Sequence, residues 1–184
     1  MSLTLNGTTG IVPVNLSTGG PSWDASGNLT IGGKITAAGG AQGLTNGSDA
    51  ASGVIGEFIA ANVPLASEVT LTTNVPATVV TMTNLPAGDW VVNGQVNYDA
   101  SGTTSITVLK QGISFSAGVF GTVNTYSVSQ SGAYVPIAAN DIAQLVRSQR
   151  ISIATPTTIY LVAQATFTLS TLKAYGILEA RRVR

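Results

Sequence analysis

The chain has 184 residues, with eight basic and eight acidic side chains, no cysteine and no histidine. Without imidazole or thiol groups it has no Ser-His-Asp triad, no cysteine nucleophile, no disulfide and no zinc site of the usual kinds. Charged residues make up 9% of the chain and hydrophobic residues 44%, so core material is plentiful and solubilising charges are few. This balance favours a protein that is not an enzyme, needs no cofactor or metal, and buries much of its surface in an assembly.

No targeting or membrane segment is expected. The sequence has no run of 18 apolar residues, the length needed to span a bilayer as a helix. Residues Met1 to Gly10 lack the basic and apolar regions of a signal peptide. We therefore expect synthesis in the cytoplasm of a host cell and no membrane insertion.

Residues 1–56 differ in composition from the rest of the chain. They contain 13 of the 21 glycines and one aromatic residue, Trp23, which is too little bulk for an independent core. Leu29, Ile31 and Ile35 keep a period of two, the spacing of a strand with one buried face. This part is predicted to be an extended, glycine-rich β segment that buries its apolar face against copies of itself.

Residues 57–184 form a series of short β patterns separated by turn signals. From Trp90 to Tyr98, for example, an apolar row that also holds Gly94 alternates with a row that is polar except at Val91. Seven or eight such strands without a convincing amphipathic helix predict an all-β fold, an antiparallel jelly-roll sandwich. The expected strands are 65–72, 78–84, 90–98, 104–109, 125–130, 150–153, 158–168 and 172–181.

Two of these strands are apolar on both faces. Tyr160 and Val162 alternate with a first apolar row in 158–168, and Tyr175 and Ile177 lie opposite Leu178 in 172–181. A lone sandwich leaves its outer faces in water, so a second apolar face predicts a second partner. We assign Tyr160, Val162, Tyr175 and Ile177 to a subunit interface; the alternative, that they are scattered surface residues, stays open.

Several phrases of the sequence resemble the C-terminal and N-terminal regions of bacteriophage tail-fibre and related virion fibre proteins. They are LPAGDW at 85–90, GEFI at 56–59, IYLVAQATF at 159–167, the ending from Ala174 to Arg184, and LTLNGTTGI at 3–11 with WDASGNL at 23–29. The resemblance implies a homotrimeric virion protein with a jelly roll like that of tumour necrosis factor or C1q. It carries no catalytic motif.

Charge is distributed unevenly along the chain. Residues 1–141 hold two basic and seven acidic side chains, whereas residues 142–184 hold six basic side chains and one acidic one. One interpretation is that the C-terminal cations bind anionic groups of a host glycan. The other is that they pair with acids of a neighbouring subunit or of the virion. The candidate basic patch consists of Arg147, Arg150, Arg181, Arg182 and Arg184.

Chemistry-bearing motifs are few. No phosphate-binding loop, nucleophile elbow or calcium loop is present. Asp89 with Asp99, or Glu57 with Glu68, are the possible carboxylate pairs for glycan hydrolysis across a subunit boundary. We favour turn and edge roles for these acids. Nucleic-acid binding is not expected, because no basic stripe is interleaved with aromatics.

Candidate recognition residues lie in the uncharged segment 116–134, which is predicted to be loops around one short strand. Its aromatic and amide side chains suit stacking on sugars and hydrogen bonding to hydroxyls. Trp90 is predicted to be core, and Asn93-Gly94 is predicted to continue a strand rather than turn. The candidate glycan-binding residues are Phe120, Asn124, Tyr126 and Tyr134.

Together these features predict a non-enzymatic phage fibre or spike protein located in the virion. Residues 1–56 would dock to other virion proteins, and residues 57–184 would form a trimeric head that binds a bacterial surface glycan or protein. Two alternatives stay open. One is a purely architectural capsid or tail subunit, and the other is a spike that hydrolyses glycans.

Overall fold

The structure is a computed structural model that describes residues 48–121, 126–134 and 141–184, together with residues 2–3, 14–15, 22–23, 25 and 29–30. For residues 130–134 and 141, and for the N-terminal pairs, the description covers the backbone alone. The chain divides into two compact units, Met1–Gly43 and Leu44–Arg184. The division of function at residue 56 stays a prediction.

The first unit contains two small antiparallel ladders. Strand β1 (Ser2–Leu3) pairs with β2 (Val14–Asn15), and β3 (Ser22–Trp23) pairs with β4 (Leu29–Thr30). The extended backbone of these pairs agrees with the predicted β segment. The expected continuation of the period-two pattern through Ile31 and Ile35 lies outside the described residues.

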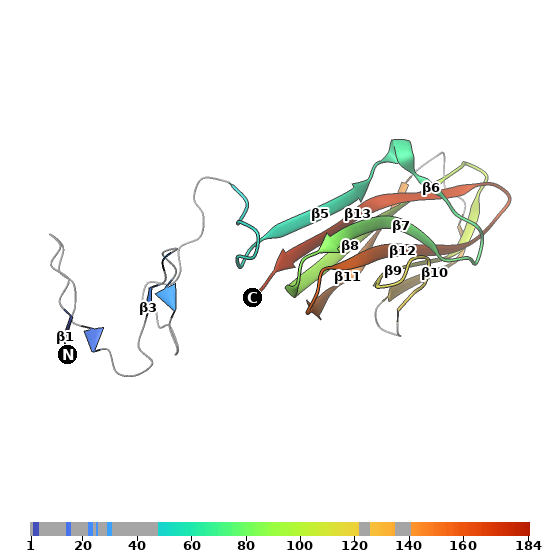
Figure 1. Ribbon diagram of the computed structural model, residues 1–184. Coiled ribbons are helices and arrows are strands. Elements are labelled where there is room, and N and C mark those ends of the chain that lie inside the picture. Colours follow the sequence, from blue (N-terminus) through green and yellow to red (C-terminus); the bar gives the residue numbers. More distant parts are fainter. Residues whose placement is uncertain are drawn as a thin grey trace. The chain divides into compact units, whose positions relative to one another are not determined.

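The second unit is an all-β sandwich of two antiparallel sheets (Figure 1). The four-stranded sheet has the order β10-β9-β12-β7, and the five-stranded sheet has the order β11-β8-β13-β5, with the short β6 also paired to β13. One 3-10 turn, η1 (Leu65–Ser67), is the sole helical element among the described residues. The strands are β5 (Phe58–Val63), β6 (Val69–Thr70), β7 (Ala77–Leu85), β8 (Gly88–Ala100), β9 (Ser105–Ser114), β10 (Tyr126–Tyr134), β11 (Asp141–Ile153), β12 (Thr157–Thr168) and β13 (Leu172–Arg182).

The chain passes back and forth between the two sheets. When the eight long strands are numbered in chain order, one sheet reads 1-8-3-6 and the other 2-7-4-5. Only the β9–β10 connection joins two neighbours of the same sheet. The first and last long strands, β5 and β13, are neighbours in this order. Their pairing runs from Phe58 opposite Arg181 to Val63 opposite Gly176.

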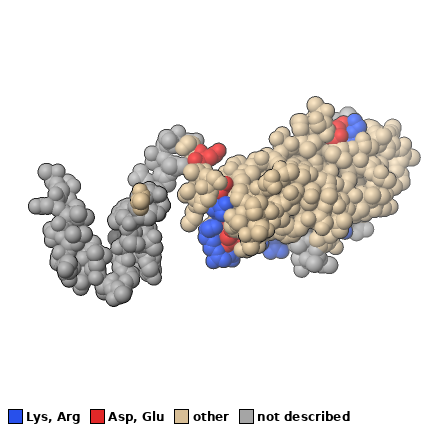
Figure 2. All heavy atoms as spheres, viewed as in Figure 1, with Lys and Arg blue, Asp and Glu red and all other residues tan. Residues whose placement is uncertain are grey.

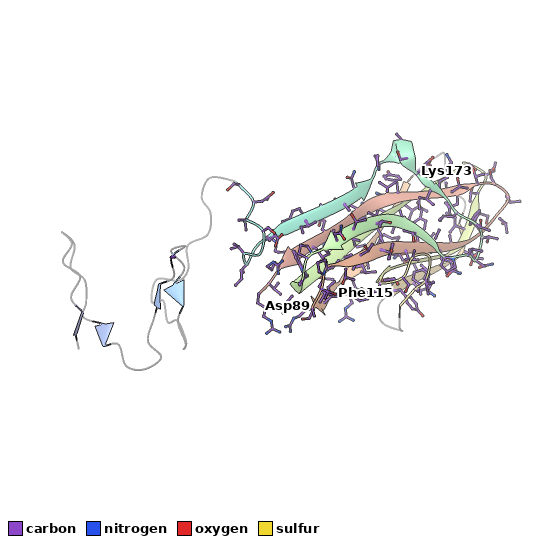
Figure 3. All side chains as sticks on the ribbon, viewed as in Figure 1. Asp89, Phe115 and Lys173 are labelled. Atoms are coloured by element: carbon purple, nitrogen blue, oxygen red, sulfur yellow. The ribbon has the colours of Figure 1, made fainter. Side chains whose placement is uncertain are left out.

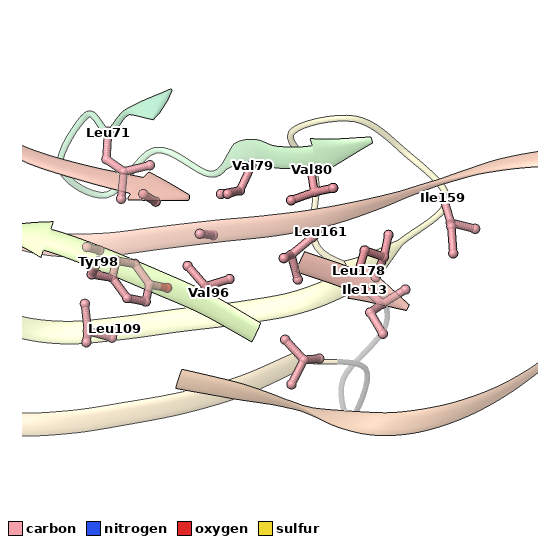
Figure 4. Packing of buried hydrophobic residues seen from close by; sticks show 14 of the residues in the cluster. Leu71, Val79, Val80, Val96, Tyr98, Leu109, Ile113, Ile159, Leu161 and Leu178 are labelled. Carbon is pink, nitrogen blue, oxygen red and sulfur yellow. The ribbon is translucent and has the colours of Figure 1, made fainter. Parts of the chain in front are cut away.

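The core forms where the inward rows of both sheets meet, as the alternation of apolar residues predicts. Val96 and Tyr98 of β8 and Leu161 of β12 are fully buried in this core (Figure 4). Trp90 of β8 belongs to the same core and is also fully buried. The Tyr98 hydroxyl donates a hydrogen bond to the Lys110 carbonyl oxygen at 2.9 Å. Burial raises the pKa of Tyr98, which keeps the phenol protonated. The predicted core positions of β8 and β12 are therefore confirmed.

Three predicted elements need correction. Residues 65–72 contain a 3-10 turn and a two-residue strand instead of one strand. The segment 116–134 holds a nine-residue strand, β10, so it is less loop-rich than predicted. Strand β11 begins at Asp141, well before the expected start at residue 150. Asn93-Gly94 continues β8, as predicted.

Each sheet also has an outer face, turned away from the core. On β12 the outer row is Tyr160, Val162, Gln164 and Thr166, because Ile159, Leu161 and Ala163 belong to the core. On β13 the outer row is Tyr175, Ile177, Glu179 and Arg181, because Ala174, Leu178 and Ala180 belong to the core. These two outer faces are the surfaces on which the candidate sites lie.

Candidate functional site

Two of the four predicted glycan-binding residues come together on the outer side of the four-stranded sheet. The rings of Phe120 and Tyr126 have centroids 5.3 Å apart and planes tilted by 49°. The Lys110 ammonium, from the neighbouring strand β9, lies 4.4 Å from the Phe120 centroid and 4.0 Å from that of Tyr126. We call these three residues the aromatic cluster.

Strand pairing explains how the aromatic cluster forms. Tyr126 opens β10 opposite Gly112, and Val128 lies opposite Lys110. Lys110 and Tyr126 are thus diagonal neighbours across two paired strands, close enough for a long side chain to reach a ring. Gly112, opposite Tyr126, adds no side chain to the outer face of the sheet. Phe120 reaches the same place from the segment after β9.

The other two predicted glycan-binding residues do not join the cluster. Asn124 lies outside the described residues. Tyr134 pairs with Ile106 at the far end of β10. Six residues of β9 separate Ile106 from Gly112, which is about 20 Å along a strand. The backbone of Tyr134 therefore lies far along β10 from Phe120 and Tyr126, and its role in glycan binding stays a prediction.

A hollow of about 310 Å³ lies next to the cluster. Its wall includes Phe120 from the cluster and Ile151 from β11, together with Phe115, which is 55% exposed. Figure 3 labels Phe115 near the end of the sandwich that also holds Asp89. Among the residues that the structure describes, no charged one lines this hollow.

The four predicted interface residues do not form one surface. Tyr160 and Val162 lie on the outer face of the four-stranded sheet, whereas Tyr175 and Ile177 lie on the outer face of the five-stranded sheet. Val162 is fully buried within the chain itself. The four residues therefore lie on two different surfaces of the chain, and their assignment to a subunit interface stays a prediction; Tyr175 and Ile177 are half-buried within the chain.

Three arginines of the predicted basic patch form ion pairs within the chain. Arg150 and Arg184 both bind the Asp89 carboxylate, each with a nitrogen 2.5 Å from Oδ2. Arg182 is buried and donates from Nε to Glu57 Oε2 at 2.8 Å, while its guanidinium lies 4.3 Å from the Trp90 ring centroid. The partners predicted on a neighbouring subunit are thus found on the same chain for these three arginines. Arg147 and Arg181 are exposed.

The carboxylates of these pairs are held in their charged form. Hydrogen bonds from Arg150, opposed by burial and helped by Arg184, hold the pKa of Asp89 below its ordinary value. Burial alone would raise the pKa of Glu57, but hydrogen bonds from Gly53 N–H, Arg182 and Ser52 outweigh it and lower that pKa. A general acid needs the opposite shift.

Within one chain Asp89 and Asp99 are too far apart to act as a glycosidase pair. They stand ten residues apart on β8, about 33 Å along the strand, whereas glycosidase carboxylates lie within about 10 Å. The hydrolase alternative, which pairs acids across a subunit boundary, stays a prediction. Glu68 forms an ion pair with Lys173. Among the described residues no group of three acidic side chains is placed to hold a metal ion, and no helix there is long and apolar enough to cross a membrane.

The contribution of Lys110 could not be seen in the sequence. It lies outside the segment 116–134, and its proximity to Tyr126 depends on the register of β9 with β10. The one available signal was its position in an otherwise uncharged β pattern. By contrast, the closeness of Phe120 and Tyr126 follows from their short separation in sequence.

Comparisons with known proteins give little further guidance. No protein-family model matches the chain, and no curated protein sequence matches it. Among solved structures, the fold is similar to a chain in the structure of the infectious bursal disease virus Gx strain, with a TM-score of 0.42 and 14% sequence identity. The match covers 78% of this chain and 38% of the viral chain, so this chain spans little more than a third of the protein that it matches.

Proposed function

We propose that this chain is a non-enzymatic structural protein of a bacteriophage particle, a fibre or spike subunit. Residues 1–56 attach it to other virion proteins, and the sandwich forms a homotrimeric head that binds the bacterial surface. The resemblance of its sequence phrases to phage fibre proteins supports the virion part of this proposal. The order of eight strands in two sheets, 1-8-3-6 and 2-7-4-5, supports a jelly-roll head.

The observation that carries the proposal is the outer face of the five-stranded sheet. In its middle, Ile177 of β13 lies between Asn62 of β5 and Gln95 of β8, and Gln95 lies beside Leu145 of β11. Leu145 is 72% exposed. The next row pairs Tyr175 with Asn97. None of these residues is charged, so a broad uncharged band crosses the whole sheet.

The charges of this face lie on both sides of that band. Glu179 of β13 lies in the row next to Ile177, and Asp89 with its two arginines marks the strand end beyond it. Asp99 and the neighbouring Lys173 lie on the other side. Figure 2 shows that charged side chains gather toward the ends and the lower rim of the sandwich, and that the broad middle of the visible face has none. An uncharged band framed by charges is typical of an interface core with a polar rim.

The experiment measures the mass of the full chain in solution by light scattering at micromolar concentration. We expect three times the 18.6 kDa mass of one chain. Ile177→Lys should give monomers, because an unpaired charge in an interface costs several kcal/mol. Val128→Lys, at a 53% exposed position of β10 outside the predicted interface residues, is the matched control and should stay trimeric. A monomeric wild type, or a fully trimeric Ile177→Lys, contradicts the proposal.

Host binding is tested separately with fluorescently labelled trimers on a panel of bacterial strains. We expect the wild type to adsorb to at least one strain. Residues 1–56 alone should adsorb to none. Adsorption to no strain, together with unchanged adsorption of particles that lack the head, would contradict the receptor-binding part and leave an architectural subunit.

A further inference from the structure

Lys110 differs from the four described cations that form ion pairs with acidic side chains. Arg150 and Arg184 bind a carboxylate, as do Arg182 and Lys173. Lys110 instead places its ammonium over the rings of Phe120 and Tyr126. In the part of the chain that the structure describes, no acidic side chain forms an ion pair with it.

The surroundings of Lys110 are uncharged across an entire sheet. The four strands β7, β9, β10 and β12 contain no Asp, Glu or Arg, and Lys110 is the one charged residue in their sequences. Its two cross-strand neighbours are Val128 and Gln164. The outer face of this sheet therefore offers one positive charge beside two aromatic rings and nothing to neutralise it.

We propose that the aromatic cluster binds a sugar that carries a carboxylate, within a glycan of the bacterial surface. This inference rests on the proposed function in host attachment and adds the chemical class of the ligand. The Lys110 ammonium has three donors, which suit a carboxylate in a charge-assisted hydrogen bond. The half-exposed rings of Phe120 and Tyr126 offer apolar faces to the C–H side of the sugar ring.

A neutral sugar could accept hydrogen bonds from Lys110 through its hydroxyls, but it would not use the positive charge. The cation over two rings is a weak contact at an exposed site and leaves its donors available to a ligand. Because the field of a lone charge is not cancelled by neighbours, it attracts anions over several ångströms and favours them over neutral ligands. Charge therefore decides the ligand class here, while the rings supply contact area.

The experiment measures binding of soluble oligosaccharides to the full-length protein by calorimetry. The probes are tetrasaccharides containing glucuronic acid, N-acetylneuraminic acid or 3-deoxy-octulosonic acid, each paired with the same molecule after reduction of its carboxyl group. Soluble probes bind one site at a time, so trimer avidity does not enter. Three variants are compared with wild type: Lys110→Gln, Lys110→Arg and Lys173→Gln. The last makes the same change at a lysine of β13, on the other sheet and outside the candidate basic patch, and is the matched control.

We expect at least one acidic probe to bind about tenfold or more tightly than its reduced partner. Lys110→Gln should remove this preference and its salt dependence, Lys110→Arg should keep most of it, and Lys173→Gln should leave it unchanged. Equal binding of both probe forms, no binding of any acidic probe, preference for sulfated or phosphorylated sugars, or an equal loss in Lys173→Gln would overturn the inference. A trimer that adsorbs to cells despite such a result leaves the proposed function standing, whereas absence of trimers or adsorption contradicts that function itself.

Discussion

Replacing Glu57 by Gln tests whether the buried ion pair at the end of the sandwich stabilises the fold. Glu57 Oε2 accepts hydrogen bonds from Arg182 Nε and from Gly53 N–H, both at 2.8 Å. The side chains of Glu57 and Arg182 are 8% and 7% exposed. Backbone bonds join the same two residues, with Arg182 N–H donating to the Glu57 carbonyl at 2.9 Å. The pair thus fastens the start of β5 to the end of β13.

The expected loss follows from the charge that Gln would leave behind. The Arg182 guanidinium would stay buried between the Trp90 ring and the Ala87 carbonyl, which accepts from Nη1 at 2.9 Å. Breaking a buried pair by removing one partner costs about 3–5 kcal/mol. For a sandwich of this size such a loss lowers the melting temperature by on the order of 10 °C.

The assay is urea unfolding followed by tryptophan fluorescence at one fixed protein concentration, since oligomer stability depends on concentration. Arg147→Gln is the control and should change the free energy of unfolding by less than about 0.5 kcal/mol. A double variant, Glu57→Leu with Arg182→Met, should lose less than the sum of the two single changes. If Glu57→Gln costs under about 1 kcal/mol, the pair behaves like an exposed one and the reasoning is refuted.

Three further outcomes are expected. The pKa values of Glu57 and Asp89 lie below the ordinary 4.5 and 3.8, so the two carboxylates stabilise the fold above those values and lose this effect as the pH falls. The urea concentration at the unfolding midpoint should therefore decrease when the pH is lowered under 4.5, and it should decrease less steeply in Glu57→Gln. Gly176→Ala should destabilise the protein by at least about 1–3 kcal/mol, because a Cβ there would lie 2.1 Å from the Gln95 carbonyl oxygen; a thermal melt that does not shift would contradict the close β8–β13 packing. Tyr98→Phe removes a buried hydrogen bond to a β9 carbonyl and should cost about 1 kcal/mol in urea unfolding, whereas an unchanged midpoint would show that this bond contributes nothing.

Alternation of apolar and polar residues was enough to predict the long central strands. β8 and β12 obey it throughout, because both lie inside their sheets and bury one face against the opposite sheet. β11 escaped notice because it is an edge strand with a register shift between Val146 and Gln149. That irregularity breaks the period of two in the sequence, although the strand itself continues through it.

The candidate site was only partly predictable, for a different reason. Phe120 and Tyr126 meet because they are close in the chain. Lys110 and Tyr134 are placed by the pairing of β10 with β9, which brings the first into the cluster and takes the second away. Register depends on tertiary packing and turn geometry, and composition carries no information about it.

The acidic part and the basic part of the sequence lie side by side in the folded sandwich, so several of their charges form ion pairs. The basic C-terminal strand runs beside β5 and β8, so Arg182 and Arg184 return to Glu57 and Asp89 of the acidic part. With those charges paired at the ends, the middle of the five-stranded sheet is left uncharged and Lys110 remains alone on the other sheet. Self-association through the first surface should then be insensitive to salt, whereas glycan binding at the second should weaken with salt. One titration with sodium chloride, followed by both light scattering and calorimetry, therefore separates the two surfaces. Parallel salt dependence would mean that they are not independent.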